Sequence, residues 1–310
     1  MKILISSRSF GKNSLDAIEM LKEQDLEPIF NPYNRKLTED ELLELIDGSI
    51  GIIAGTEKIT GKIMKEAKSL KVISRYGIGL DNIDLNTAKK LGIIVKNTPE
   101  APSQAVAELT VGLIFSALRR INQSDQNVKS GQWKQIIGNL IYGKNIGVIG
   151  LGRIGKKLSI LLEPFQVNIL ACEPNPDKQF ISKHNIKLVS FKEIISKSDI
   201  VSLHLPLTDE TRNIIGKNEL SLMKKEVIII NTSRGGLIDE NALIDALENN
   251  KIAGAAIDVF EVEPYNGKLK EFNNVILTPH IGSYTKETRA QMELETVQNL
   301  ITGLREVKIL

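Results

Sequence analysis

The sequence predicts an α/β protein in which parallel sheets are covered by helices on both faces. Short runs rich in Ile and Val recur along the chain, and longer segments with apolar residues at helical spacing lie between them. This alternation is the pattern of repeated βα units. Each run in the second half of the chain is about as apolar as a strand that is buried on both faces should be. With 310 residues, 42% of them hydrophobic, the chain is large enough to form two cores.

The first third of the chain is expected to alternate between four strands and four helices. The strands are placed at 2–6, 51–54, 72–74 and 93–96. The helices are placed at 15–24, 38–46, 60–67 and 84–91. Thr38 and Glu41 have the spacing of a capping box, and Gly48 and Gly92 stand where helices usually end.

The middle of the chain is expected to be one long helix followed by a loop and a second series of strands. Residues 101–127 carry apolar side chains at helical spacing, which favours a core or bridging helix. Residues 131–143 show no clear periodicity and are expected to form a loop. The second series of strands is placed at 145–149, 167–171, 200–203, 227–231 and 252–258.

Composition excludes several classes of function. The 40 Lys and Arg are balanced by 38 Asp and Glu in an interspersed pattern, so no basic field for nucleic acid is expected. The single cysteine, Cys172, cannot form an internal disulfide or a CxxC metal site, which fits a reducing compartment. Apolar runs such as 227–230 are too short to span a bilayer, and the N-terminus lacks a secretory signal. We therefore expect a cytoplasmic protein without a metal site or a membrane segment.

A glycine-rich motif directly follows the strand expected at 145–149. Its three glycines have the Gly-x-Gly-x-x-Gly spacing, and a helix-like run at 156–162 comes next. Gly150 permits a tight turn, Gly152 lets the backbone approach a pyrophosphate, and Gly155 allows the helix to pack closely on the strand. The helix N-terminus offers free N–H groups to the phosphates. This context predicts a dinucleotide-binding site.

An acidic residue stands where the dinucleotide fingerprint requires one. Glu173 follows the next strand, about 20 residues beyond the last glycine, and would hold the hydroxyls of the adenosine ribose. A carboxylate there would repel a 2′-phosphate, and residues 174–176 offer no Arg to receive one. We therefore expect NAD rather than NADP as the cofactor.

Three residues near the ends of later strands offer a cation, a base and a carboxylate. Hydride transfer between a 2-hydroxy acid and NAD requires a cation for the carboxylate and the C2 oxygen, a base for the hydroxyl proton, and a carboxylate that orients the base. Arg234, His280 and Glu263 supply these groups. Surface arginines and glutamates are common, so spacing alone leaves this assignment open.

The two other histidines have less distinctive surroundings. His184 lies among polar residues and is expected to be a solvated surface residue. His204 ends a strand, where a structural role and a role near the cofactor both remain open.

Four ordered motifs together resemble the D-isomer-specific 2-hydroxyacid dehydrogenases. They are Gly-Leu-Gly-Arg-Ile-Gly at 150–155, Asn-Thr-Ser-Arg-Gly-Gly at 231–236, Asp-Val-Phe-Glu-Val-Glu-Pro at 258–264 and Thr-Pro-His-Ile-Gly at 278–282. The resemblance runs from about residue 75 to residue 285, and the first 70 residues match in pattern only. It implies that Arg234 binds the substrate carboxylate and C2 oxygen, that Glu263 supports the histidine, and that His280 is the acid/base. Glu261 would have no such role.

The resemblance also implies cofactor contacts that the residues alone do not. Arg153 and Ile154 would meet the pyrophosphate, Leu205 and Thr232 would line the crevice, and Asp258 would hold the nicotinamide carboxamide. The remaining cofactor contacts would come from Thr98, His280 and Gly282.

The implied fold consists of two doubly wound parallel-sheet domains with the substrate held between them. A Rossmann cofactor domain would comprise residues 99–285. A flavodoxin-like substrate domain would comprise residues 1–98 and 286–310, including a returning helix at 286–304. Homodimerisation through the cofactor domain is the usual state of the family.

The loop at 75–84 bears on the substrate. Backbone N–H groups of Gly77, Ile78 and Gly79 could form a nest for a carboxylate, although a strand-to-helix turn would need the same glycines. Arg75 adds a cation, and the stretch is similar to the corresponding loop of 3-phosphoglycerate dehydrogenases. This favours 3-phosphoglycerate and 3-phosphohydroxypyruvate as the substrate pair, in an enzyme without a regulatory domain.

Other functions stay open at this point. Glyoxylate and hydroxypyruvate reductases, or other 2-keto acid reductases, can carry a similar loop. Some relatives are NAD-responsive binding proteins without turnover, and a phosphite-type oxidoreductase could use the same Arg, Glu and His.

Overall fold

The chain forms two compact units, which a computed structural model describes over all residues 1–310. Unit 1 comprises Met1–Pro102 and Ser283–Leu310, and unit 2 comprises Ser103–Gly282. The domain boundaries expected from the sequence, after residues 98 and 285, fall a few residues from these. Unit 1 is therefore discontinuous in sequence, and its last helix comes from the C-terminal end.

Unit 1 is built on one sheet of five parallel strands in the order β2-β1-β3-β4-β5. This is the flavodoxin-like, doubly wound order. The strands are β1 (Lys2–Ile5), β2 (Glu27–Phe30), β3 (Gly51–Ala54), β4 (Val72–Arg75) and β5 (Ile94–Asn97). We did not expect β2 from the sequence, because it is a half-exposed edge strand that contains Pro28 and has no apolar run.

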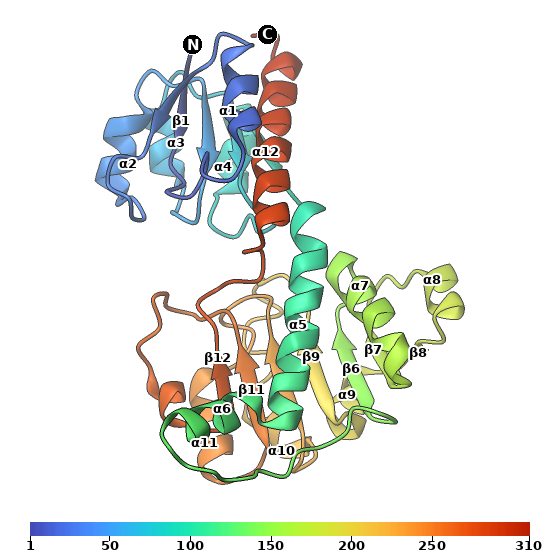
Figure 1. The fold of residues 1–310 in the computed structure, drawn as a ribbon. Coiled ribbons are helices and arrows are strands. Elements are labelled where there is room, and N and C mark those ends of the chain that lie inside the picture. Colours follow the sequence, from blue (N-terminus) through green and yellow to red (C-terminus); the bar gives the residue numbers. More distant parts are fainter. The chain divides into compact units, whose positions relative to one another are not determined.

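Helices cover both faces of this sheet (Figure 1). The helices of unit 1 are α1 (Leu15–Lys22), α2 (Glu39–Ile46), α3 (Gly61–Glu66), α4 (Leu85–Lys90) and α12 (Lys286–Glu306). Ile3 and Ile5 pack against α1 and α12 on one face. Leu4, between them, packs against α2, α3 and α4 on the other face. This alternation explains why three consecutive residues of the strand are apolar.

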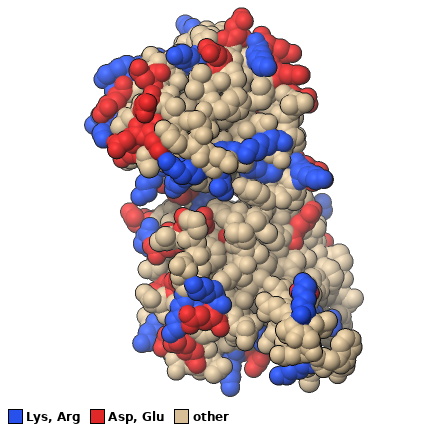
Figure 2. Space-filling view, turned by 60° about the vertical axis from the view of Figure 1, so that its left-hand side comes forward, with Lys and Arg blue, Asp and Glu red and all other residues tan.

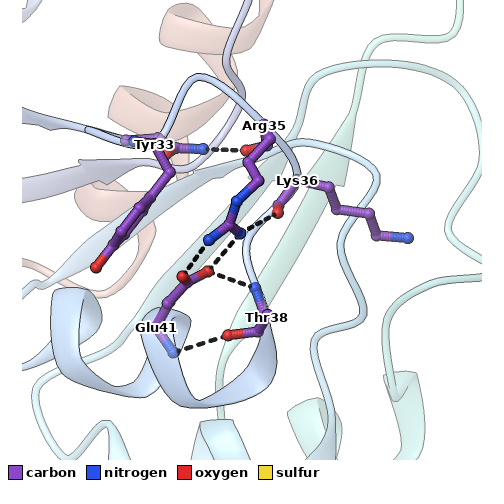
Figure 3. A network of polar contacts seen from close by, with 6 residues as sticks. Tyr33, Arg35, Lys36, Thr38 and Glu41 are labelled. Atoms are coloured by element: carbon purple, nitrogen blue, oxygen red, sulfur yellow. Dashed lines mark hydrogen bonds and ion pairs between the residues drawn. The ribbon is translucent and has the colours of Figure 1, made fainter.

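A polar network fixes the start of α2 (Figure 3). Thr38 and Glu41 form the expected capping box. Arg35 donates to both oxygens of the Glu41 carboxylate, at 2.8 and 2.5 Å, and its guanidinium lies 4.9 Å from the centre of the Tyr33 ring. The hydrogen bonds from Arg35 lower the pKa of Glu41 to about 2. Beyond α2 and α4, Gly48 and Gly92 have positive φ angles of +70° and +69°, as expected of C-terminal caps.

Unit 2 is built on seven parallel strands in the order β12-β11-β10-β9-β6-β7-β8. This is the Rossmann order, extended by one strand. The strands are β6 (Asn145–Ile149), β7 (Asn168–Cys172), β8 (Lys187–Leu188), β9 (Ile200–Leu203), β10 (Ile228–Asn231), β11 (Gly254–Ile257) and β12 (Val275–Leu277). Strand β8 lacked a sequence signal, because it has two exposed residues at the sheet edge. The series of strands placed from the sequence also omits the short strand β12.

The helices of unit 2 also lie on both faces of the sheet (Figure 1). They are α5 (Ala101–Arg119, which begins in unit 1), α6 (Ile121–Lys129), α7 (Arg153–Leu162), α8 (Lys178–Lys183), α9 (Phe191–Lys197), α10 (Lys217–Leu222) and α11 (Glu240–Glu248). Residues of α5 and α7 pack on one face of the sheet. Residues of α9, α10 and α11 pack on the other.

The single helix expected at 101–127 is wrong, because α5 and α6 are separate. Arg120, between them, has a left-handed φ of +55°. The loop at 131–143 crosses the end of α5, where the N–H of Asn139 donates to the carbonyl oxygen of Leu118 at 2.9 Å. In a continuous helix, the Leu118 carbonyl would instead accept an N–H of the next turn. The break between α5 and α6 therefore coincides with a tertiary contact and not with a helix-breaking residue.

Helix α5 also corrects our expectation about apolar length. By length and composition alone it could cross a membrane, unlike the shorter runs considered above. However, 56% of its apolar window is buried inside the protein, as in a core helix.

The charge pattern matches the balanced composition. In Figure 2, basic and acidic side chains alternate over the face in view without a large field of one sign.

Candidate active site

The loops that follow five strands of unit 2 meet at the carboxyl edge of the sheet. The strand order reverses between β6 and β9, and such a switch point forms a crevice at the carboxyl ends of the strands. The loops after β6, β9, β10, β11 and β12 carry nearly all the site residues that the sequence indicates in this unit. Parallel topology therefore gathers residues that lie far apart in the sequence.

The three glycines of the loop after β6 have different structural requirements. Gly150 has a φ of +94°, and a Cβ there would lie 2.5 Å from the carbonyl oxygen of His204. A Cβ at Gly155 would lie 2.2 Å from the Gly150 carbonyl oxygen. A Cβ at Gly152, the N-cap of α7, would meet no atom within 4 Å. Two glycines are thus required by packing, and the third leaves open space at the helix N-terminus, where a pyrophosphate would fit.

The carboxylate of Glu173 is fixed beside this loop, just beyond β7. Its Oε2 accepts the N–H of Leu151 at 2.9 Å, and its Oε1 accepts the N–H of Asn175 at 3.1 Å. These bonds place an acidic group next to the glycine loop, as the adenosine ribose of NAD requires. The neighbouring Cys172 is half-buried, and burial raises the pKa of its thiol.

The loop after β10 is braced from within and carries Arg234. The side chain of Asn231 donates to the Arg234 carbonyl at 2.8 Å and accepts the N–H of Ser233 at 3.1 Å. Arg234 is half-buried, and its Nη1 donates to the Ser233 carbonyl at 2.7 Å. A Cβ at Gly235 would lie 2.1 Å from the backbone of Phe260, so this loop touches the loop that follows β11.

His280 and Glu263 form a pair at the same edge. The Nδ1 of His280 lies 3.1 and 3.0 Å from the two oxygens of the Glu263 carboxylate. Burial acts to raise the pKa of Glu263, but the hydrogen bond and charge of His280 and the charge of Arg234 outweigh it and hold the pKa below its usual value. The carboxylate is therefore ionised, and the Nε2 side of the imidazole is the side that can face a substrate.

Asp258 holds the loop that carries His280. It is fully buried after β11. Its Oδ1 accepts the Thr278 hydroxyl at 2.6 Å and the N–H of Ile281 at 2.8 Å, and its Oδ2 accepts the N–H of Gly282 at 2.9 Å. Burial is the largest influence and raises the pKa of Asp258 in spite of these donors.

The segment after β9 connects the glycine loop to the Arg234 loop. The N–H of His204 donates to the Ile149 carbonyl at 2.8 Å, and the Leu205 carbonyl accepts the Ser233 hydroxyl at 2.5 Å. The His204 Nε2 lies 2.8 Å from the Ser202 hydroxyl, and its Nδ1 is buried without a partner. Burial lowers the pKa of His204 to about 4, so the ring is neutral near pH 7.

Thr232 packs against α5. Its hydroxyl lies 2.9 Å from the hydroxyl of Thr110, which donates to the Val106 carbonyl at 2.8 Å. Thr110 therefore accepts the proton of Thr232, and the end of β10 is fixed to the central helix.

The remaining site residues expected from the sequence lie in unit 1. Arg75 is buried at the end of β4, and its Nη1 donates to the Tyr76 carbonyl. The N–H of Gly77 donates to the Thr98 hydroxyl at 2.8 Å, so Gly77 is not available to a nest of donors as we expected. The N–H groups of Ile78 and Gly79 make no backbone hydrogen bond. Thr98 is fully buried and holds this loop.

Comparison with known proteins decides the family. Residues 111–282 match the family model described as D-isomer specific 2-hydroxyacid dehydrogenase, NAD binding domain. The chain belongs to this family.

Named relatives of this chain fall into two groups. A D-3-phosphoglycerate dehydrogenase from Methanocaldococcus jannaschii is 45% identical over 82% of this chain and 49% of its own length. The chain thus spans about half the length of that relative. A glyoxylate reductase from Thermococcus litoralis is 38% identical over 97% of this chain and 92% of its own length. A crystal structure of a glyoxylate reductase from Paecilomyes thermophila has a TM-score of 0.89 at 32% identity, covering 100% of this chain and 97% of that one.

The structure shows where the residues indicated by the sequence lie. Arg234, Glu263 and His280 lie on neighbouring loops of one unit, and Glu261 is exposed and paired with Arg212 at 3.2 Å. His184, expected to be solvated, has a side chain only 12% exposed, with Nδ1 2.5 Å from a Glu163 carboxylate oxygen.

Several residues that brace the site were not expected from the sequence. They are Thr110, Ser202, Asn231 and Thr278. A local signal existed only for Asn231, because an Asn at a strand end before Ser and Gly is typical of a turn that its side chain closes.

Proposed function

We propose that this protein is an NAD-dependent oxidoreductase that interconverts D-2-hydroxy acids and 2-keto acids. The observation that carries the proposal is the pairing of His280 with Glu263, at 3.0 Å, together with the charge of Arg234 acting on the same carboxylate. This set provides a base, a group that orients the base and a cation for the substrate carboxylate.

Each residue has one task in this proposal. Arg234 binds the substrate carboxylate and polarises the C2 oxygen. His280 takes the C2 hydroxyl proton during oxidation and returns it during reduction, while Glu263 holds the ring in place. NAD, when bound, supplies the hydride acceptor.

We propose that the cofactor lies along the carboxyl edge of the unit 2 sheet. Gly150, Gly152, Arg153, Ile154 and Gly155 would hold the pyrophosphate. Glu173 would hold the adenosine ribose and exclude a 2′-phosphate, because both of its oxygens are already fixed by backbone N–H groups. The other proposed contacts are Thr98, Leu205, Thr232, Asp258, His280 and Gly282.

The proposed substrate pair is 3-phosphoglycerate and 3-phosphohydroxypyruvate. Support comes from the phosphoglycerate dehydrogenase of M. jannaschii and from the 75–79 loop, in which Arg75, Ile78 and Gly79 would contribute to substrate binding. A glyoxylate or hydroxypyruvate reductase is the second candidate. Its support is the likeness to the T. litoralis enzyme over 92% of that enzyme's length.

A panel of 2-keto acids separates these candidates. The purified protein is assayed for NADH oxidation with 3-phosphohydroxypyruvate, hydroxypyruvate, glyoxylate and pyruvate, and for NAD reduction with phosphite. Preference for the phosphorylated acid supports the first candidate, and preference for glyoxylate or hydroxypyruvate supports the second. NADH binding without any turnover would contradict both and leave the NAD-responsive binding protein.

We further propose that the protein is a cytoplasmic homodimer joined through unit 2. Large apolar side chains are exposed on α6 and on the following loop, which runs along the outside of unit 2 (Figure 1). They are Ile121, Val128, Trp133, Ile137, Leu140 and Tyr142. Exposed apolar side chains that gather on one segment mark an interaction surface, and a second copy is the occupant that the family resemblance implies.

A further inference from the structure

Unit 1 contains a buried arginine outside the residues discussed so far. Arg289, in the first turns of α12, is only 7% exposed. Its guanidinium lies 4.3 Å from the centre of the Tyr76 ring and 4.6 Å from the centre of the Tyr284 ring. Its Nη2 donates to the hydroxyl of Ser9. Two aromatic rings and a hydroxyl therefore hold the guanidinium in one position.

The charge of Arg289 is not balanced by an ion pair. Glu293, one turn further along α12, is fully buried but accepts the side chain of Asn13 at 2.9 Å and the N–H of Ser14 at 2.8 Å. Arg289 forms no salt bridge with it, and its one side-chain acceptor is the neutral hydroxyl of Ser9. Buried charges are normally paired, and a guanidinium has five N–H donors. The residue therefore retains the capacity to bind an anion.

The surroundings of Arg289 are also rich in donors. Ser9 follows β1 and Tyr76 follows β4, so the guanidinium lies at the carboxyl edge of the unit 1 sheet, where the ligands of α/β proteins bind. The hydroxyl of Ser7 lies 3.4 Å from that of Ser9. Glu57, a carboxylate at the same edge, accepts the Ser6 hydroxyl and the N–H of Gly55. Both bonds are accepted by one carboxylate oxygen, Oε1.

We propose that Arg289 determines substrate specificity by binding a second anionic group, a phosphate or a carboxylate, on the 2-keto acid. This inference rests on the proposed function and adds a cation to the 75–79 loop. Arg75 supports that loop through its bond to the Tyr76 carbonyl. Arg289 instead offers a planar guanidinium whose paired N–H donors match the geometry of an oxyanion. The hydroxyl of Ser9 orients this guanidinium by accepting its Nη2 donor.

Matched substrate pairs test this role. We would compare Arg289→Met and Arg289→Lys with the wild type on 3-phosphohydroxypyruvate against hydroxypyruvate, and on oxaloacetate against pyruvate. For Arg289→Met we expect the KM of at least one doubly anionic acid to rise about 10- to 100-fold, as for loss of a charged hydrogen bond. The KM of its singly anionic partner should change less than about twofold, and kcat for both should stay near the wild-type value.

Two further variants support the interpretation. Arg289→Lys keeps the positive charge but lacks the planar guanidinium, and it should retain part of the affinity for the doubly anionic acid. Arg305→Met removes an arginine near the end of the same helix, where the side chain contacts only Gln24 at 3.1 Å. It should leave all four KM values unchanged.

Several outcomes would overturn the proposal. An equal rise in KM for both members of each pair would show that Arg289 is only structural, and no change in any KM would show that it does not meet the substrate. If no 2-keto acid is turned over, the proposed function fails, and thermal shifts decide the inference. Stabilisation by 3-phosphoglycerate but not by glycerate, lost in Arg289→Met and partly retained in Arg289→Lys, would support it. Equal stabilisation by both ligands, or none by either, would refute it.

Discussion

The position of the His280 ring depends on a buried carboxylate that does not touch the ring. Asp258 fixes Thr278, Ile281 and Gly282, and its carbonyl accepts the N–H of His280 at 2.9 Å. The left-handed φ of His280, +54°, is thus held from both sides. Orientation of the base is therefore shared between Glu263, through the side chain, and Asp258, through the backbone.

Removal of the base should lower turnover strongly and leave cofactor binding nearly intact. We expect His280→Ala to lower kcat by about 100- to 10,000-fold, the usual contribution of acid/base catalysis. The dissociation constant of NADH, measured by fluorescence, should stay within a few fold of the wild-type value. Turnover equal to that of the wild type would remove His280 from the mechanism.

The two glutamates of the 258–264 motif should behave differently. Glu263 contacts His280, whereas Glu261 contacts Arg212 on the surface. Glu263→Gln should lower kcat by at least about tenfold, and Glu261→Gln is the matched control with wild-type kcat. Because the pKa of Glu263 lies below its usual value, its carboxylate stays ionised under mildly acidic conditions. Protonation of Glu263 should therefore limit the rate only at a pH below the usual pKa of a glutamate, as a pH profile of kcat would show.

His204 should make the stability of unit 2 depend on pH. Its pKa of about 4 in the folded protein lies below the value of about 6.5 expected in the unfolded chain. The unfolded state therefore binds the proton more readily, and stability falls as the pH drops from about 7 towards 4. The loss between pH 7 and pH 5 should be about 2 kcal/mol.

Denaturation at several pH values, for the wild type and for His204→Gln, measures this dependence. The variant keeps a polar group near the Ser202 hydroxyl and should lose this part of the pH dependence. An unchanged slope in the variant would mean that other groups cause it.

Among the elements, the turn from β6 into α7 contains one glycine that is required for packing and another that is required for cofactor binding. A Cβ at Gly155 would collide with the Gly150 carbonyl, whereas one at Gly152 would point into open space. Gly155→Ala should therefore destabilise unit 2 by about 1–3 kcal/mol. Gly152→Ala should change stability by less than about 1 kcal/mol but weaken NADH binding at least about tenfold. Melting curves and NADH titrations measure both effects, and identical behaviour of the two variants would contradict the assignment.

The sequence signal of an element depended on how deeply the element is buried. The central strands β6 and β9 occupy the residues expected, because strands buried on both faces are continuous apolar runs. The edge strand β2 is half-exposed and gave no such signal. The break between α5 and α6 depends on the contact of Asn139 with Leu118, which no local pattern contains.

Prediction of the site residues is likewise limited where a residue's role depends on a tertiary contact. Arg234, Glu263 and His280 were candidates because catalysis requires their chemistry, and the family resemblance then assigned their roles. The bond from Gly77 to Thr98 and the pair formed by Thr110 with Thr232 depend on tertiary proximity. They are visible only once the chain is folded.

For the whole molecule, the exposed apolar segment of unit 2 predicts the oligomeric state. Trp133 is 88% exposed and Ile137 94% exposed. The double variant Trp133→Lys, Ile137→Asp should convert the proposed dimer into a monomer without a large change in melting temperature, because neither side chain is part of a core. Leu15→Asp, at an exposed position of unit 1 (76%), is the matched control and should stay dimeric.

Light scattering after size exclusion measures the mass directly. A wild-type monomer, or a double variant that remains dimeric, would refute this assignment of the interface.

The path of the chain through the two units also constrains the order in which these units fold during synthesis. Helix α12 supplies Met292, Val297, Leu300 and Leu304 to the same core as Ile3 and Ile5. A ribosome translates all of unit 2 between these two parts. Until α12 has been translated, one apolar face of the N-terminal sheet is incompletely covered. All residues of unit 2 have been translated by then, so unit 2 can fold first. Synthesis should thus complete the second unit first, and the first unit closes only when its last helix leaves the ribosomal tunnel.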